Sequence, residues 1–452
     1  MAKKDSACLL EYFFGSNVLI FLAFFLVCLL SYANSFQNQF MLDDNWVLFG
    51  PHGMLNRSFL GIFQHNQGGS FYRPIGHVPL WVFSRLFGSN FTAYHAANFF
   101  LFVCTIFFLF VIVRKITSDA PLSFFSAVLY AIHPLNGMIV NYITASVIAV
   151  FVLSMQASFW CFMRFSEHGR KRDYMLCFVF FIFACLSHEM AVMLPVYLAA
   201  YLFFIKKESW GNGVRFLSPF VLFFLVWTAI RSQDHIFHNR VSGPFQAIGN
   251  ITAYFSTWMD LVTWYVSNLF FPNKVLFLWS SQYGTEHLLR NLIFFVLVIG
   301  MGLYALLKWK RSWQSFFLVI FVAGLLPTVF SCFLDFPGIW PIIEPHWFYF
   351  SESGFFVLLA WFLLTMARKN SFIGGALGVG VILLFFIHCW DYNAKWKSQE
   401  IYSRYWLSLN KGNWTPYDAL AKSLMDKGDR QGMLKCFVGL AELHYNLPLT
   451  YK

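Results

Sequence analysis

The chain has 452 residues, of which 58% are hydrophobic and only 12% are charged, about half the charged share of an ordinary soluble domain. So few charges would not cover a soluble enzyme of this size, and nine cysteines that mostly lie in apolar runs do not indicate a secreted disulfide-rich protein. The net charge of +11 does not predict a nucleic-acid partner, because the basic residues are spread through short gaps between apolar runs. A polytopic α-helical protein embedded in a lipid bilayer remains.

Eleven apolar segments are candidate membrane-spanning helices, since one span needs about 20 apolar residues. The first runs from about Ser16 to Ala33, behind Lys3 and Lys4, and lacks the small-residue cleavage site of a removable signal sequence. The other ten are centred near Val103, Val128, Leu153, Phe181, Pro195, Phe223, Val298, Val322, Leu359 and Val381. We therefore predict an all-α fold with about eleven transmembrane helices.

Lysine and arginine residues set the predicted orientation of these spans. With the N-terminus in the cytoplasm, half of the 32 basic residues fall in gaps that face the cytoplasm. The short outer turns near His133, His188 and Phe336 then contain none. Most acidic residues fall on the opposite side, and an odd number of spans places the C-terminus there too. We expect any chemistry on this extracytoplasmic face.

Three long outer segments give the predicted domain organisation. Residues 1–390 form a transmembrane domain, with a first outer loop over residues 34–92 and a second over residues 231–289, and residues 391–452 form an extracytoplasmic tail. Within the second loop, Phe255 to Phe270 has a helical period and predicts an amphipathic helix along the membrane interface that ends at Phe271-Pro272. A twelfth span is the alternative, but it would move the charges near Lys308 to the outside.

The tail is mostly polar and ends in a predicted helical hairpin. Pro416 to Pro448 has the pattern of two amphipathic helices separated by Lys427-Gly428-Asp429. This pattern resembles one tetratricopeptide unit of about 34 residues, and a plain helical hairpin fits it as well. Because one such unit is too small to be stable alone, we expect it to pack on the transmembrane domain.

The first outer loop contains two candidate functional features. Asp43 and Asp44 are adjacent carboxylates at a predicted membrane surface, where mutual repulsion and partial desolvation raise a carboxylate pKa towards that of a general base. Two solvated loop acids are the plain alternative. Arg73, in Phe71-Tyr72-Arg73-Pro74, can bind a phosphate through two hydrogen bonds, or simply extend to lipid headgroups.

Further ionisable residues lie at the predicted outer ends of the spans. Such residues in an apolar bundle are functional candidates by default, although they also cap helices and fix turns. The candidates are His133, His188, Glu189, Glu344, His346 and Tyr349. His95, at the start of the second span, is expected to make a packing contact between helices more than a functional one.

Known metal and nucleotide motifs are absent from the sequence. It has no CxxC pair, no HExxH, no carboxylate-rich calcium loop, no Walker A motif and no GxGxxG. We therefore expect no dedicated metal site and no soluble nucleotide donor, with a divalent cation left open.

Taken in order, these segments resemble the GT-C superfamily of membrane glycosyltransferases over nearly the whole chain. The nearest group is the transmembrane and tetratricopeptide-repeat O-mannosyltransferases and their bacterial relatives. YANSFQNQFMLDDNWVLFG (Tyr32–Gly50) is similar to that family's first outer loop, in which an aspartate pair follows the first span. FYRPIGHVPLW resembles its Arg-Pro segment, AIHPLNGMIV its His-Pro turn, SHEMAVMLPVYLAAY its Lys-Glu turn and EPHWFYFSESG its final outer loop. The order and spacing carry the resemblance more than any single motif.

Several positions depart from the family pattern. His188 replaces a usual Lys, Ser146 a frequent Arg, Trp347 an expected Arg and Ser351 an expected Pro. One repeat-like unit replaces the usual array, and this short tail favours a bacterial inner membrane over the endoplasmic reticulum. The departures leave the donor sugar and the acceptor open, and they would also fit a specialised member.

The resemblance implies a membrane-embedded inverting glycosyltransferase whose donor is a sugar on a polyprenyl or dolichyl phosphate. Asp43 or Asp44 would deprotonate a hydroxyl of a protein, glycan or lipid acceptor, which attacks the anomeric carbon and releases the lipid phosphate. The charge that develops on this phosphate needs a cation. The implied phosphate-binding residues are Arg73, Arg231, Arg240 and His346. The implied sugar or acceptor pocket contains His133, Glu189, His188, His95, Glu344 and Tyr349.

Other classes of function remain open at this point. A glycan polymerase or ligase that uses a lipid-diphosphate oligosaccharide would have basic residues in a large outer loop, and residues 231–289 contain some. A transporter predicts inverted repeats and ionisable residues near the middle of the membrane, and neither pattern is evident. A non-catalytic scaffold would explain the replaced Lys and Arg positions.

Overall fold

The computed structural model describes residues 12–64, 72–231, 251–333 and 340–445. It is 81% helical, so the prediction of a nearly all-α protein is confirmed. Six helical segments are long and apolar enough to cross a membrane: Asn17–Gln37, Phe91–Thr117, Ile143–His168, Leu288–Trp309, Trp313–Cys332 and Ser371–Lys395. Two shorter apolar helical segments cover Glu189–Ile205 and Gly213–Ala229. The number of eleven spans stays a prediction.

The helices of the first half occupy the positions predicted from hydropathy. They are α2 (Asn17–Tyr32), α5 (Phe91–Thr117), α6 (Ala120–Ala131), α8 (Ser146–His168), α9 (Lys171–Cys185), α10 (Leu194–Ala200) and α11 (Trp210–Arg231). Polar side chains define where several begin, because they accept the hydrogen bonds of otherwise unpaired N–H groups. Ser16, Asn90 and Asp119 do so at the starts of α2, α5 and α6.

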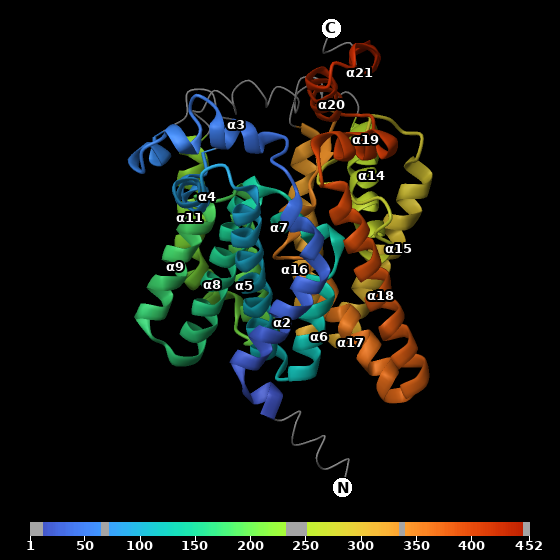
Figure 1. Ribbon diagram of the computed structural model, residues 1–452. Coiled ribbons are helices and arrows are strands. Elements are labelled where there is room, and N and C mark those ends of the chain that lie inside the picture. The colour runs from blue at the N-terminus through green and yellow to red at the C-terminus, as the bar shows by residue number, and fades with distance from the viewer. Residues whose placement is uncertain (1–11, 65–71, 232–250, 334–339, 446–452) are drawn as a thin grey trace.

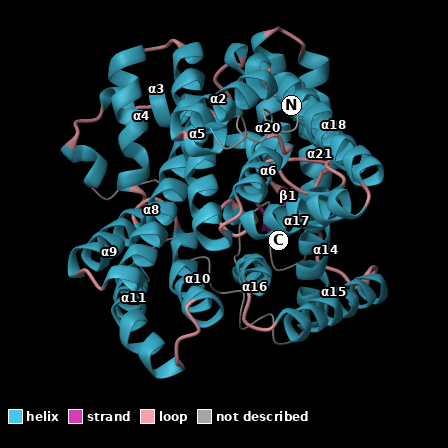
Figure 2. Cartoon of the chain, turned by 90° about the horizontal axis from the view of Figure 1, so that it is seen from below, coloured by secondary structure: helices cyan, strands magenta, loops and turns pink. Residues whose placement is uncertain are grey.

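The helices of the second half are α14 (Ile251–Phe270), α15 (Leu288–Trp309), α16 (Trp313–Leu325), α17 (Ser353–Lys369) and α18 (Ser371–Lys395). Viewed along the bundle, α11, α10, α16 and α15 follow one another along one side (Figure 2). Helix α8 is the most enclosed of the six long segments, with 78% of its apolar window buried. It packs between α5, α9 and α4 (Pro74–Phe87).

The chain bends sharply after α6. The segments Ala120–Ala131 and Pro134–Asn141 meet at 64°, with Pro134 just after the break. Since proline lacks a backbone N–H and does not continue a helix, the break follows from the sequence. It is followed by the short helix α7 (Met138–Asn141) and the 3-10 turn Ile143–Ala145, which bring residues 141–145 under the first outer loop.

Short helices cover one end of the bundle. Helices α3 (Asp43–Phe49), α19 (Gln399–Leu409), α20 (Thr415–Asp426) and α21 (Arg430–Tyr445) lie at the end opposite to the start of α2 (Figure 1). Strand β1 (Trp279–Ser280) pairs antiparallel with β2 (Ile342–Ile343), and the side chain of Asn410 hydrogen-bonds Ser280 next to them. The tail is therefore attached to the two segments that precede α15 and α17.

Two predicted outer features have the expected helices. Helix α14 ends at Phe270, directly before Phe271-Pro272, and buries one side of its surface against the 3-10 segment Leu326–Phe333, β2 and α15. Helices α20 and α21 form a hairpin around Gly428, whose φ of +76° lies in the region that glycine adopts without strain. The hairpin agrees with the predicted helix pair, while its relation to tetratricopeptide repeats stays a prediction.

Candidate active site

Four segments that are distant in sequence bring ionisable side chains together at the covered end of the bundle. They are the start of α3, the residue before α4, the turn between α9 and the 3-10 helix Glu189–Met193, and the 3-10 helix Pro345–Phe348 with the residue before it. These segments carry Asp43 and Asp44, Arg73, His188 and Glu189, and Glu344 and His346, respectively. The structure thus joins seven of the residues predicted for the site.

Asp44 is buried and held by three hydrogen bonds. Its Oδ1 accepts from the backbone N–H of Thr144 at 2.8 Å and from the Thr144 hydroxyl, and its Oδ2 accepts from the N–H of Met41 at 3.1 Å. Burial raises the pKa of Asp44 to about 7, although these hydrogen bonds oppose the increase and the neighbouring Asp43 adds to it. With both oxygens in use, Asp44 is suited to fixing the loop more than to attacking a substrate.

Asp43 is exposed to solvent, unlike its neighbour Asp44. Its backbone N–H donates to the Tyr142 hydroxyl at 3.2 Å. Nearby protein atoms desolvate the carboxylate enough to raise its pKa, while a hydrogen bond with the Tyr142 side chain lowers it. A surface-accessible carboxylate with a raised pKa has the properties of a general base.

The backbone before the aspartate pair is strained. Leu42 has a φ of +48° and a ψ of −121°, a conformation that residues with a side chain rarely adopt. Its N–H donates to Oε1 of Gln399, the first residue of α19, at 3.2 Å, and Gln399 in turn donates to the carbonyl of Ala419 in α20. The tail therefore fixes the loop that carries Asp43.

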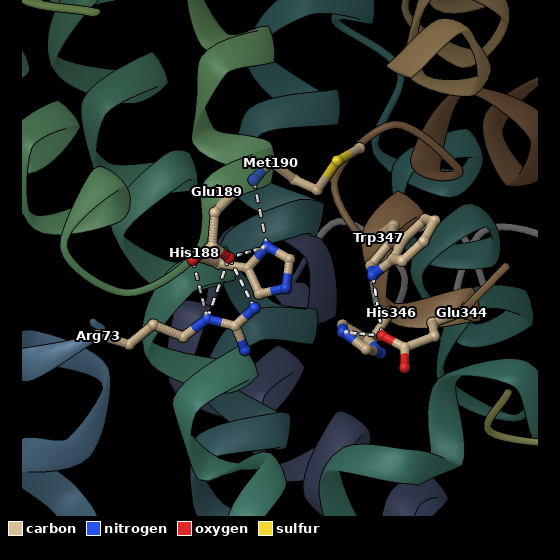
Figure 3. Close-up of polar contacts among 7 residues, drawn as sticks. All are labelled: Arg73, His188, Glu189, Met190, Glu344, His346 and Trp347. Atoms are coloured by element: carbon tan, nitrogen blue, oxygen red, sulfur yellow. Dashed lines mark hydrogen bonds and ion pairs between the residues drawn. The ribbon is translucent and has the colours of Figure 1, made fainter. Parts of the chain in front are cut away.

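Arg73 forms an ion pair with Glu189 at the centre of the cluster. Its Nη2 and Nε lie 2.6 Å and 3.0 Å from Glu189 Oε2, and the two side chains are 18% and 38% exposed. Figure 3 shows the guanidinium group reaching the carboxylate beside the His188 ring. The arginine lies where the sequence predicted a phosphate-binding cation, and its charge is balanced by a carboxylate in this state.

A second pair lies next to the first. His346 Nε2 is 3.2 Å from Glu344 Oε2, and this oxygen also accepts from Trp347 Nε1 at 2.9 Å. The His188 and His346 rings are 5.2 Å apart and nearly perpendicular, at 89° (Figure 3). Two histidines and two carboxylates from distant segments thus surround one arginine.

The pKa of Glu344 shows that these groups act on one another. Burial raises it to about 7, Arg73 and the Trp347 hydrogen bond lower it, and the negative charges of Asp43 and Glu189 raise it. Burial lowers the pKa of both histidines, and the positive charge of Arg73 adds to this effect. The histidines are therefore neutral near pH 7, and the carboxylates outnumber the cations in the cluster.

His133 and Tyr349 do not join this cluster. The Tyr349 hydroxyl donates to the Leu135 carbonyl at 2.8 Å, and the His133 ring packs against Phe356 and Phe385. They lie in a fully buried region beside Glu352, whose Oε2 accepts from the Tyr265 hydroxyl at 2.6 Å. Both side chains are enclosed by the protein in this structure, and the sugar pocket predicted at His133 and Tyr349 stays a prediction.

His95 is also a structural residue. Its Nδ1 lies 2.7 Å from the Val140 carbonyl and its Nε2 lies 3.0 Å from the Asn38 carbonyl, so both ring nitrogens are in use. Asn98, one turn later, donates to the carbonyls of Tyr142 and Ile143. The start of α5 therefore positions both the aspartate loop and the segment before Thr144, and the pocket role of His95 stays a prediction.

The side chains of two arginines predicted to bind phosphate lie outside the part of the chain that the structure describes. Arg231 is the last residue of α11 and its side chain is outside the described part, and Arg240 lies outside the described residues. Conversely, the sequence analysis missed Tyr142, Thr144 and Gln399. Their role depends on contacts across about 100 residues or more, and no local motif marks them. Within the described residues, no group of three or more His, Cys, Asp or Glu side chains is arranged to bind a metal ion.

Residues 74–231 match the family model described as dolichyl-phosphate-mannose-protein mannosyltransferase. The matched segment covers about a third of the chain, and it supports a GT-C type glycosyltransferase. It covers α4 to α11, including His188 and Glu189, and it confirms the resemblance seen in the sequence motifs. No curated protein and no solved structure matches the chain.

The description of the matched family indicates a coarse function. It supports a membrane glycosyltransferase of the mannosyltransferase class, in a family described by a dolichyl-phosphate-linked mannose donor. The apolar helices agree with an integral membrane protein. Asp43, Glu344 and His346 lie outside the matched segment, so their assignment depends on the geometry described above.

Proposed function

We propose that this protein transfers a sugar from a polyprenyl or dolichyl phosphate to a hydroxyl group, with inversion at the anomeric carbon. The observation that carries the proposal is the convergence of Asp43, Arg73 and the Glu344–His346 pair at one end of an apolar helical bundle. A carboxylate base and a cation that lie within electrostatic reach of each other supply the two charges that this reaction needs. A membrane bundle also suits a donor whose hydrocarbon chain stays in the bilayer.

Asp43 acts as the general base in this proposal. It takes the proton of the acceptor hydroxyl while the hydroxyl oxygen attacks the anomeric carbon. The bond between that carbon and the phosphate oxygen breaks, and its electron pair leaves with the lipid phosphate. One base and one displacement invert the configuration, so no second carboxylate is needed as a nucleophile. Asp44 holds the loop through Thr144 and Met41.

Arg73 contacts the phosphate of the donor. The leaving phosphate gains negative charge, and a guanidinium can hold two of its oxygens at once. Because Glu189 already pairs with Arg73, the phosphate exchanges with or joins this carboxylate when it binds. Glu189 and Glu344 then border the sugar, and His188 lies between the sugar and the phosphate.

We place the site on the extracytoplasmic face of a membrane with about eleven spans and a cytoplasmic N-terminus. The distribution of Lys and Arg between the apolar segments supports this orientation.

The acceptor is a protein or a glycan that the tail helps to bind. Residues 1–390 form the catalytic domain and residues 391–452 the tail, and Gln399 connects the two at the aspartate loop. The contacts of α19 with the loop support a role of the tail at the site itself.

Sugar transfer by the purified full-length protein in nanodiscs tests this proposal. Radiolabelled polyprenyl-phosphate sugars are offered with cell-envelope extract as acceptor, and wild type is compared with Asp43→Asn and Arg73→Ala. The proposal predicts transfer by wild type and loss of transfer in both variants. Transfer only from a lipid-diphosphate oligosaccharide would instead support a glycan polymerase or ligase.

A further inference from the structure

Two buried ring nitrogens in the cluster have no hydrogen-bond partner among the described residues. They are Nε2 of His188 and Nδ1 of His346. Their ring centroids are 5.2 Å apart and the rings are nearly perpendicular, beside Arg73, Glu189 and Glu344 (Figure 3). Buried polar groups in native proteins are nearly always paired, so unpaired nitrogens on two neighbouring rings at a candidate site indicate that a ligand pairs them.

The existing contacts define the protonation state of His188. Its Nδ1 accepts the backbone N–H of Met190 at 3.2 Å, so this nitrogen carries no hydrogen. In the neutral ring the proton is then on Nε2, which is a donor without an acceptor. A ligand that completes His188 must therefore offer an acceptor atom.

The existing contacts of His346 leave Nδ1 as an acceptor in the neutral ring, unlike Nε2 of His188. Its Nε2 lies 3.2 Å from Glu344, which is an acceptor when it is ionised. The neutral ring then carries its proton on Nε2, and Nδ1 has a lone pair that becomes a donor only after the ring takes up a second proton. Glu344 would stabilise the resulting imidazolium, as carboxylates do for adjacent histidines.

The groups around the two rings favour proton uptake when an anion arrives. Arg73 from the residue before α4 opposes protonation of both rings, while Glu189 from the 3-10 helix Glu189–Met193 favours it for His346. Glu344 lies next to His346 on the same segment, and a positive charge on His188 would oppose one on His346. Both histidines are neutral without a ligand because burial disfavours their charged form, and a bound anion reverses this balance.

We propose that His188 and His346 form an oxyanion subsite that binds the phosphate diester of the donor lipid together with one proton. His188 donates its Nε2–H to one phosphate oxygen. His346 takes up a proton at Nδ1 and donates it to another phosphate oxygen, while its Nε2–H stays on Glu344. This proposal rests on the proposed function, since it names the atoms that receive the donor's phosphate.

The subsite also accounts for the charge of the leaving group. The donor is a diester with one negative charge, and the departing lipid phosphate is a monoester whose second ionisation has a pKa near 6. As the bond to the sugar breaks, the proton on His346 Nδ1 moves to the phosphate oxygen that receives the electron pair. The acceptor's proton is on Asp43, which releases it to solvent. The other proton leaves with the lipid phosphate, and His346 takes up a new one when the next donor binds.

The number of protons taken up on binding tests this proposal. Isothermal titration calorimetry with the full-length protein in nanodiscs, at pH 7 in two buffers of different ionisation enthalpy, gives this number. The probe is the methyl ester of farnesyl phosphate, a diester that does not titrate near pH 7 and cannot transfer a sugar. We expect about one proton per bound diester, and an affinity that falls about tenfold per pH unit between the pKa of the free histidine and that of the bound histidine.

Three variants separate this subsite from a merely structural role. His346→Gln keeps a donor for Glu344 but cannot take up a proton, so uptake falls to near zero and affinity falls about tenfold. His188→Gln keeps an N–H at the position of Nε2 and retains uptake. His168→Gln, at the opposite end of α8 where Nδ1 of His168 lies 3.0 Å from the Arg164 carbonyl, leaves both quantities unchanged.

The outcomes distinguish this inference from the proposed function. If His346→Gln still takes up one proton, or if the wild-type affinity does not change between pH 6.5 and 8.5, the inference is wrong even where wild type transfers sugar. If wild type binds the diester with one proton but transfers no sugar from any lipid phosphate, the subsite is supported and the proposed function is not. If wild type does not bind the diester, both are overturned.

Discussion

Thr144 donates two hydrogen bonds to one oxygen of Asp44, a residue that precedes it by 100 positions. The contact connects the first outer loop to the turn between α7 and α8, and it leaves Asp43 on the accessible side of the loop. The two aspartates therefore have different environments although they are adjacent in sequence. Their division into a structural and a reactive carboxylate follows from this contact.

Replacing Thr144 tests the structural part of this division. Thr144→Val removes the hydroxyl at nearly constant volume and leaves the backbone N–H, so Asp44 loses one of its donors. We expect a loss of about 1–2 kcal/mol of stability, since a buried acceptor loses a partner. Thermal unfolding in detergent measures it. Thr144→Ser, which keeps the hydroxyl, should stay close to wild type, and equal losses in both variants would contradict the role of the hydroxyl.

Replacing each aspartate by asparagine should have different effects on the transfer rate and on the melting temperature. Asp43→Asn should lower the transfer rate roughly 10²–10⁴-fold, the usual contribution of a general base, with an unchanged melting temperature. Asp44→Asn should lower the melting temperature, because an amide places an N–H against the N–H of Met41. Initial rates and thermal unfolding of both variants, measured in parallel, check this. A destabilised Asp43→Asn with normal turnover per folded molecule would reverse the assignment.

The raised pKa of Asp44 predicts a pH-dependent contribution to stability. Its pKa is about 7 in the folded protein against 3.8 in the unfolded chain, so the folded state holds the proton more tightly. This contribution is complete below about pH 4 and is lost as the pH rises through about 7. The difference in melting temperature between wild type and Asp44→Asn should therefore narrow from pH 5 to pH 8. A difference that widens over this range would show that the pKa of Asp44 is lowered instead.

Exchanging the charges of Arg73 and Glu189 separates the contribution of their ion pair to stability from the contribution of Arg73 to donor binding. Arg73→Ala should raise KM for the lipid donor about tenfold to hundredfold, because a bidentate phosphate contact is lost. The double variant Arg73→Glu with Glu189→Arg restores an ion pair but moves the cation away from the α4 side. It should regain thermal stability relative to the single variants without regaining donor affinity. Recovery of both would indicate that only the pairing matters.

The hydrogen bond between Leu42 and Gln399 predicts that the tail holds the loop that carries Asp43. Gln399→Leu leaves the N–H of the strained Leu42 without an acceptor, at a cost of about 1 kcal/mol, and should lower transfer several-fold. Lys422→Ala is a matched control, since it removes only an exposed ion pair with Asp418 in the same tail. Initial rates at saturating donor compare the two variants. Equal activity in both would remove the proposed connection between tail and site.

The positions of the helices could be predicted from the sequence because hydropathy and capping residues act locally. Every predicted span centre, from Val103 in α5 to Val381 in α18, falls on a helix, and Ser16, Asn90 and Asp119 cap theirs. The arrangement of the site could be predicted only where a residue type is chemically distinctive, as with Asp43, Arg73 and Glu344.

The rest of the site depends on tertiary contacts that no local pattern encodes. His95 and His133 have the same chemical character as His346, but the carbonyls of Asn38 and Val140 occupy both nitrogens of His95, and aromatic rings enclose His133. Thr144 carries no motif. A histidine at the outer end of a span therefore joins the cluster only if the folded chain places it beside Arg73 and the carboxylates.

Sugar transfer from a lipid phosphate to a hydroxyl acceptor tests the central claim most directly. The assay offers single-sugar polyprenyl phosphates to wild type and to Asp43→Asn in nanodiscs, and it detects the stereochemistry of the product by NMR. The account predicts an inverted glycoside from wild type and none above background from Asp43→Asn. A product with retained configuration, or undiminished transfer by Asp43→Asn, would contradict it.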